Sequence, residues 1–164
     1  MQVRFTKRAD GRHRLTVVRD DGTASRGQVI PGLGKAAIPH DLLHAVVEKT
    51  LGLRRGVYGM VNAGLDIAEL LDPAQKPALK AEAELMVSEI VTSLLQAETA
   101  YEGADATLFG GELRRRCAEA RVREPTIDED ALGELRRLRE DYEARWGRLA
   151  VGETLEVDIG GETA

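Results

Sequence analysis

The stretch of the chain from residue 38 to residue 51 reads Ile38-Pro39-His40-Asp41-Leu42-Leu43-His44-Ala45-Val46-Val47-Glu48-Lys49-Thr50-Leu51. Its leucines and valines recur three and four residues apart, which is the spacing of one helix face. Pro39 suits the first turn of a helix, where no backbone N–H donor is needed. The sequence therefore predicts an amphipathic helix over 38–51 that packs its apolar face on the rest of the fold.

Two of the three histidines of the chain lie on this helix, one turn apart. At about 100° per residue, His40, His44 and Glu48 fall within about 80° of one another, at the border of the apolar face. A histidine in the first turn is close to the positive end of the helix dipole, which favours the neutral imidazole that binds metals. We therefore predict a divalent transition-metal site at His40, His44 and Glu48, with zinc as the metal.

The sequence identifies the third ligand of such a site less clearly than the two histidines. Glu48 lies about 12 Å from His40 along the helix axis, so one ion bound by all three would be strained, and Glu48 fits better as a partner of His44. Further candidates as ligands or as their hydrogen-bond partners are Asp41, His13, Glu84 and Glu98.

The reasons for choosing these candidates come from their positions. His13 shares a strand face with Leu15 and Val17 and so points toward whatever covers that face. Glu84 and Glu98 fall at or inside the apolar arc of a helix predicted over 78–99, whereas Glu89 and Gln96 are expected to face away from it. Each candidate also has a structural interpretation, because histidines at the edge of an apolar face commonly make local hydrogen bonds, and residues at hairpin ends and arc edges commonly reach solvent.

Two resemblances accompany the histidine pair. The segment His-Asp-x-x-His at 40–44 resembles the opening of the metal motif of the coenzyme Q biosynthesis family, in which a Glu follows after eleven residues; Gly56 stands at that position here. The segment His-Asp-Leu-x-His-x-x-x-Glu, followed by Gly56-Val57-Tyr58-Gly59, Gly64 and Asp66-Ile67, is similar to that of an uncharacterised family of small bacterial proteins. The second resemblance covers most of the chain and implies no activity.

Two classes of function follow from these residues. If a metal bound by the histidines keeps an open position, the protein is expected to be a metal-dependent hydrolase. The spacing also resembles the two-histidine half of the HExxH motif, but Asp41 stands where the glutamate base would be, and it is one methylene shorter. The alternative is a non-enzymatic interaction module, such as a homodimer built on apolar helices, in which the histidines are purely structural.

Composition limits the remaining classes. The 164 residues are 43% hydrophobic and 31% charged, as expected for one globular domain, and with one cysteine and no long apolar run we expect a cytoplasmic protein without membrane contact. Residues 1–35 carry eight Lys or Arg and three Asp or Glu, whereas the rest carries 15 and 25. The acidic part would repel nucleic acid, so a small molecule or a protein is the expected partner. The glycine-rich segment 32–37 lacks the spacing of a phosphate loop, so no nucleotide cofactor is expected.

The expected fold is α+β. Alternating residues and the turns at Asp10-Gly11 and Asp21-Gly22 predict a three-stranded meander over 1–30, and a returning strand is predicted over 153–159. The intervening region, 38–148, is expected to supply about five helices covering a small antiparallel sheet. The longest of these, 78–99, is expected to be the central helix, and a capping box at Thr126-Ile127-Asp128-Glu129 predicts the start of the last one.

Overall fold

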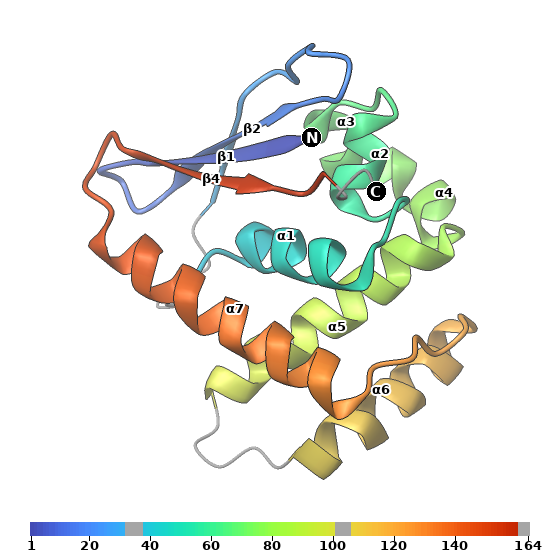
Figure 1. The fold of residues 1–164 in the computed structure, drawn as a ribbon. Helices are drawn as coiled ribbons and strands as arrows, with labels where there is room; N and C mark the ends of the chain where they lie inside the picture. Colours follow the sequence, from blue (N-terminus) through green and yellow to red (C-terminus); the bar gives the residue numbers. More distant parts are fainter. Residues whose placement is uncertain (32–37, 101–105, 161–164) are drawn as a thin grey trace.

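The computed structural model describes residues 1–31, 38–100 and 106–160. These residues form a four-stranded antiparallel sheet and seven α-helices (Figure 1). The expected α+β class is confirmed. The described helices outnumber the expected five because the middle of the chain is divided into short segments. Gly64, with a backbone φ of +113°, separates two of them, and prolines begin the next.

The sheet combines the two ends of the chain. Its strands are β1 (Gln2–Lys7), β2 (His13–Val18), β3 (Gln28–Ile30) and β4 (Thr154–Asp158), in the order β3-β2-β1-β4. The returning strand β4 pairs with β1, and Nε of Arg4 on β1 lies 3.0 Å from Oε1 of Glu156 on β4. Both side chains are about half exposed, so this ion pair contributes less than about 1 kcal/mol. The third strand of the predicted meander has only three residues, and an isolated bridge between Val18 and Ala24 precedes it.

Helices fill the region between β3 and β4. Their bounds are α1 His40–Leu51, α2 Val57–Asn62, α3 Ile67–Leu71, α4 Lys76–Lys80, α5 Ala83–Ala100, α6 Ala106–Ala120 and α7 Glu129–Arg148, with a 3-10 turn at Pro73–Gln75. Buried side chains from all four strands and from six of these helices belong to one hydrophobic cluster.

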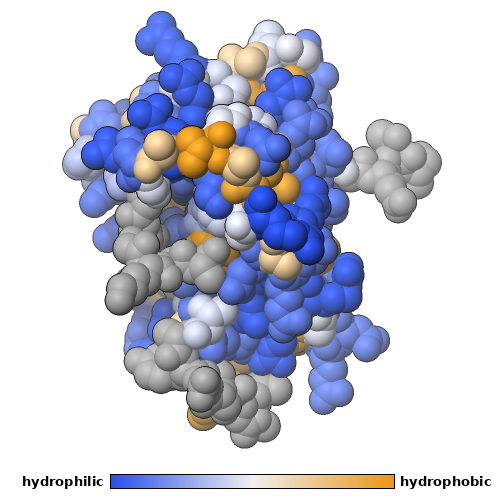
Figure 2. Space-filling view, turned by 90° about the vertical axis from the view of Figure 1, so that its left-hand side faces the viewer, coloured by the Kyte–Doolittle hydropathy of each residue, from blue (hydrophilic) through white to orange (hydrophobic). Residues whose placement is uncertain are grey.

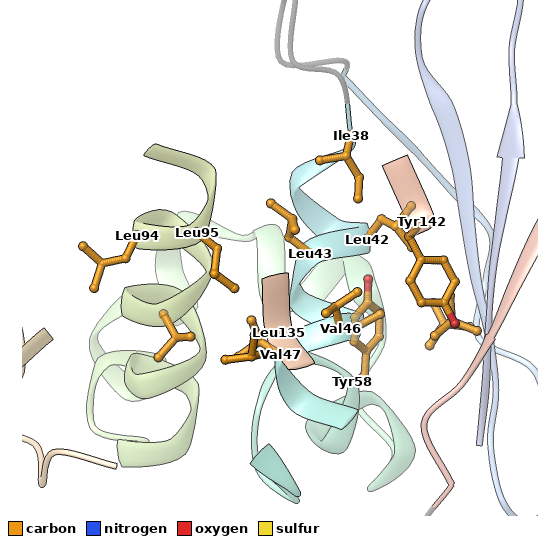
Figure 3. Packing of buried hydrophobic residues seen from close by; sticks show 14 of the residues in the cluster. Ile38, Leu42, Leu43, Val46, Val47, Tyr58, Leu94, Leu95, Leu135 and Tyr142 are labelled. Carbon is orange, nitrogen blue, oxygen red and sulfur yellow. The ribbon is translucent and has the colours of Figure 1, made fainter. Parts of the chain in front are cut away.

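The centre of the fold is α1, and not the longer α5 that was expected there. Every residue from Leu42 to Glu48 is buried, so α1 is covered on all sides. It lies between the sheet and the pair α5 and α7 (Figure 1). Leu43 and Val47 project toward α5, while Leu42 and Val46 project from the other side of α1 (Figure 3). The two polar residues in this span, His44 and Glu48, must therefore find partners inside the protein.

Acidic side chains cap the starts of α3 and α7, and in α7 the capping residue is not the predicted one. Asp66 and Glu69 form a reciprocal capping box at the start of α3. The box predicted from Thr126 to Glu129 was wrong: α7 begins at Glu129, and the carboxylate of Asp128 accepts a hydrogen bond from the Ala131 N–H at 2.8 Å. Asp128, and not Thr126, therefore caps α7 and satisfies one of the free backbone donors at its start.

Two further sequence predictions concern loops and surface. The connector 32–37 lies outside the described residues. Among the helices that the structure describes, none has both the length and the hydropathy needed to cross a membrane. The face shown in Figure 2 is predominantly hydrophilic, and its hydrophobic residues form small separate groups.

Candidate metal centre

The two histidines of α1 lie close together, with their ring planes nearly perpendicular. The ring centroids are 4.7 Å apart, and the two Nε2 atoms face each other at 3.1 Å. His44 is only 2% exposed, whereas the side chain of His40 is 23% exposed. The pair therefore reaches from the interior to the surface.

Glu89 of α5 completes the group. Its Oε1 lies 3.4 Å from Nε2 of His44, and its Oε2 lies 3.6 Å from Nε2 of His40. One ligand atom from each of the three residues can be chosen so that all lie within 4.8 Å of one another. Ligand atoms bound to a tetrahedral zinc ion at about 2.0–2.1 Å are about 3.3–3.4 Å apart, which is close to these separations.

The other ring nitrogens are held by α5. Nδ1 of His40 lies 2.9 Å from Oε1 of Gln96, and Nδ1 of His44 lies 2.8 Å from Oγ of Ser88. The amide oxygen of Gln96 can only accept, so Nδ1 of His40 carries the hydrogen in this bond. In a neutral ring, Nε2 is then left with its lone pair, directed toward His44 and Glu89.

The mutual arrangement changes the acidity of two of these groups. The hydrogen bond to Glu89 raises the pKa of His40 against the opposing effect of burial, with Gln96 contributing in the same direction. The close contacts with His40 first and then with His44 hold the pKa of Glu89 well below its usual range. The carboxylate of Glu89 is therefore ionised at neutral pH, and the cluster attracts cations.

Glu48 is not placed as a metal ligand. Its carboxylate lies beyond His44, where Oε1 and Oε2 accept hydrogen bonds from the Val57 and Tyr58 N–H groups at 2.6 and 2.9 Å. The Ser88 hydroxyl lies between Glu48 and His44, whose nearest nitrogen, Nδ1, is 4.0 Å from Oε1. Burial raises the pKa of Glu48, although the charge of His44 and these hydrogen bonds act in the opposite direction.

Asp41 and His13 pair with each other and not with the metal cluster. Nε2 of His13 lies 3.1 Å from Oδ2 of Asp41, and His13 is 3% exposed. Neither the ligand role nor the exposed position considered for His13 agrees with this placement. Asp41 follows His40 on the helix and therefore points to a different side, toward the sheet.

Glu84 and Glu98 of α5, the two carboxylates considered as metal ligands on the predicted helix 78–99, have other partners. Glu84 accepts hydrogen bonds from the N–H groups of Arg54 and Arg55, both at 2.7 Å. Glu98 pairs with Arg136 and Arg139 of α7. The histidines instead meet Glu89 and Gln96, the residues expected to face away from the apolar arc. The side chain of Glu89 is 48% exposed, so it does lie outside the apolar arc and meets the histidines at the edge of the interface.

A signal for this pairing is present in the sequence. Polar residues on α1 recur every four residues at positions 40, 44 and 48, and polar residues on α5 recur with the same spacing at 88, 92 and 96. The two lines run in opposite directions, so that His40 meets Gln96 and Glu48 meets Ser88. Searching for two polar lines of matching period would have found Ser88, Thr92 and Gln96, and Glu89 stands next to the first of them.

No family model, curated protein or solved structure matches this chain. The chemistry of the cluster therefore rests on its own geometry. Two imidazole nitrogens and one carboxylate, brought together by two packed helices, form a donor set that suits zinc and neighbouring transition metals.

Proposed function

We propose that His40, His44 and Glu89 bind one divalent transition-metal ion, with zinc as the preferred metal. The observation that carries the proposal is the convergence of these three side chains: the two Nε2 atoms are 3.1 Å apart, and each lies 3.4 or 3.6 Å from its nearer Glu89 oxygen. One ligand atom from each residue can be chosen so that all three lie within 4.8 Å of one another. When both Nε2 atoms are unprotonated, two nitrogen lone pairs and a carboxylate at these distances repel one another. A metal ion bound between them removes that repulsion, and a proton on Nε2 of His40 is its competitor.

The exposure of the group favours a centre that contacts solvent over a closed structural site. The side chain of Glu89 is 48% exposed and that of His40 is 23% exposed. Structural zinc sites use four protein ligands, whereas catalytic sites use three and leave a fourth position for water or substrate. We therefore propose metal-assisted hydrolysis as the reaction class, with His44 as the buried ligand and Glu89 as the ligand at the surface.

The first test is metal stoichiometry. Wild-type protein reconstituted with zinc and passed through a desalting column is expected to retain one zinc per chain, measured by elemental analysis. His40→Ala and His44→Ala should each lose stoichiometric zinc, because two ligands do not hold the ion at micromolar concentration. His13→Gln is the matched control, since an amide can still hydrogen-bond Asp41, and it should retain the metal.

Two results would contradict parts of this proposal. If wild-type protein holds no zinc, both as purified and after reconstitution, the interaction module is the correct interpretation. If zinc is bound but an activated ester such as 4-nitrophenyl acetate is hydrolysed no faster than by His44→Ala, the metal site stands and the proposed hydrolysis does not.

A second prediction concerns pH. Because the pKa of His40 is raised, its proton competes with the metal up to a higher pH than for a free imidazole. Zinc affinity should therefore fall as pH falls, by about tenfold per pH unit once His40 is protonated in the metal-free protein. Calorimetric titrations in buffers of different ionisation enthalpy will measure the proton release. An affinity that is constant between about pH 5.5 and pH 8 would contradict ligation by the histidines.

A further inference from the structure

A line of three buried polar side chains leads away from the cluster, beginning at His44. The exposed fractions are 2% for His44, 0% for Ser88 and 1% for Glu48. Oγ of Ser88 lies 2.8 Å from Nδ1 of His44 and 3.0 Å from Oε1 of Glu48. The line joins α1 to α5 and ends at the first backbone N–H groups of α2.

The donor and acceptor in each hydrogen bond of this line are fixed by the bonds that the Glu48 carboxylate makes with the backbone of α2. The Val57 and Tyr58 N–H groups can only donate, and they occupy both oxygens of the Glu48 carboxylate. An ionised carboxylate only accepts, so the Ser88 hydroxyl donates to it. The oxygen of Ser88 then accepts from Nδ1–H of His44, and Nε2 of His44 is left without a hydrogen.

The local backbone leaves space for this carboxylate. A Cβ atom added to Gly56 would lie 2.3 Å from Cδ of Glu48 and 2.5 Å from its Oε1. A residue with a side chain at position 56 would therefore displace Glu48 from Ser88 and from the start of α2. The absence of a side chain at this point is required for the line to exist.

We propose that Ser88 and Glu48 are positioning residues that hold His44 in the Nδ1–H tautomer and so direct its unprotonated Nε2 at the metal position. The metal-affinity part of this inference rests on the proposed function. The tautomer part does not, because it is a property of the metal-free protein. Partners of metal-bound histidines beyond the ligand sphere typically change metal affinity by about 10–100-fold when they are removed.

The decisive variant removes both hydroxyls near Nδ1 of His44. Thr92 Oγ1 lies 3.4 Å from the same nitrogen and can replace Ser88 as an acceptor, so we choose Ser88→Ala combined with Thr92→Val. The matched control is Ser93→Ala combined with Thr99→Val. It makes the same changes on the same helix, at hydroxyls that donate to the carbonyls of Ile90 and Gln96.

Nitrogen-15 NMR of metal-free protein at about pH 9, where free imidazole is neutral, reports the tautomer directly. Wild type and control should show His44 with hydrogen on Nδ1, and the double variant should show a mixture or the Nε2–H form. Its zinc dissociation constant should rise by about tenfold or more, while that of the control stays within about twofold of wild type.

The possible failures are distinguishable. An Nε2–H tautomer of His44 in the wild type overturns the inference without the use of any variant. A double variant that keeps the Nδ1–H tautomer and the wild-type zinc affinity also overturns it, and leaves the metal site standing. If the tautomer shifts as expected but wild-type protein binds no zinc, the positioning of the ring is supported and the proposed function is overturned.

Discussion

Replacing Glu89 by glutamine is expected to weaken zinc binding by about 100-fold or more, equivalent to about 2.7 kcal/mol. Glutamine has nearly the shape of glutamate, but its neutral amide is a poor metal ligand. The carboxylate is also the only charged member of the trio at neutral pH when both rings are neutral. Competition of the protein with a chromophoric zinc chelator measures the change, and circular dichroism of the metal-free variant checks that the fold is retained.

Glu84→Gln is the matched control for this experiment. It makes the same change on the same helix, at a residue whose Oε2 accepts backbone hydrogen bonds from Arg54 and Arg55. The glutamine oxygen can keep those bonds, so zinc affinity should stay within about twofold of wild type. If Glu89→Gln binds zinc as tightly as Glu84→Gln does, the third ligand is not Glu89 and the proposed site is wrong.

Replacing Gly59 by alanine is expected to destabilise the fold by about 3 kcal/mol. A Cβ atom at this position would lie 2.0 Å from the carbonyl oxygen of Arg54 and 2.4 Å from its carbon. Both are backbone atoms, so either α2 or the loop before it must move. That movement would disturb the fully buried Tyr58 next to Gly59. Thermal unfolding should show a melting temperature lower by about 6–12 °C.

The control for Gly59 is a helical glycine with free space around it. Gly133 lies inside α7, and a Cβ added there meets no atom within 4 Å. Gly133→Ala should therefore stabilise the protein by about 0.5–1 kcal/mol, because alanine loses less backbone entropy on folding. If both variants change the melting temperature in the same direction and by the same amount, the contact of Gly59 with Arg54 is not the cause.

The line of hydrogen-bonded side chains from His44 through Ser88 to Glu48 explains why the sequence suggested Glu48 as a metal ligand. It stands one turn after His44, and helix spacing alone puts it on the side of the histidines. In the folded protein its carboxylate is directed to Val57 and Tyr58 and reaches His44 only through Ser88. Sequence spacing placed Glu48 near His44, but it did not show which atoms would face each other.

Glu98 shows the opposite error. Its position on the apolar side of α5 suggested that it would meet the histidines of α1. Arg136 and Arg139 of α7 pack against that end of α5 and bind its carboxylate. A buried charge takes the nearest opposite charge, and the identity of that neighbour depends on a helix that lies more than 30 residues away in sequence.

The sequence by itself determined the local features: that α1 is a helix with His40 and His44 on successive turns, that alternating segments at both ends of the chain form strands, and that β4 returns to the sheet. These follow from the spacing of residues along the chain and from turn-forming residues. Only the tertiary structure decided that Glu89 is the third member of the cluster, that Ser88 links His44 to Glu48, and that His13 pairs with Asp41. The rotation and offset of α1 against α5 and the sheet select those pairs, and they are set by packing over the whole interface and not by the spacing within either helix.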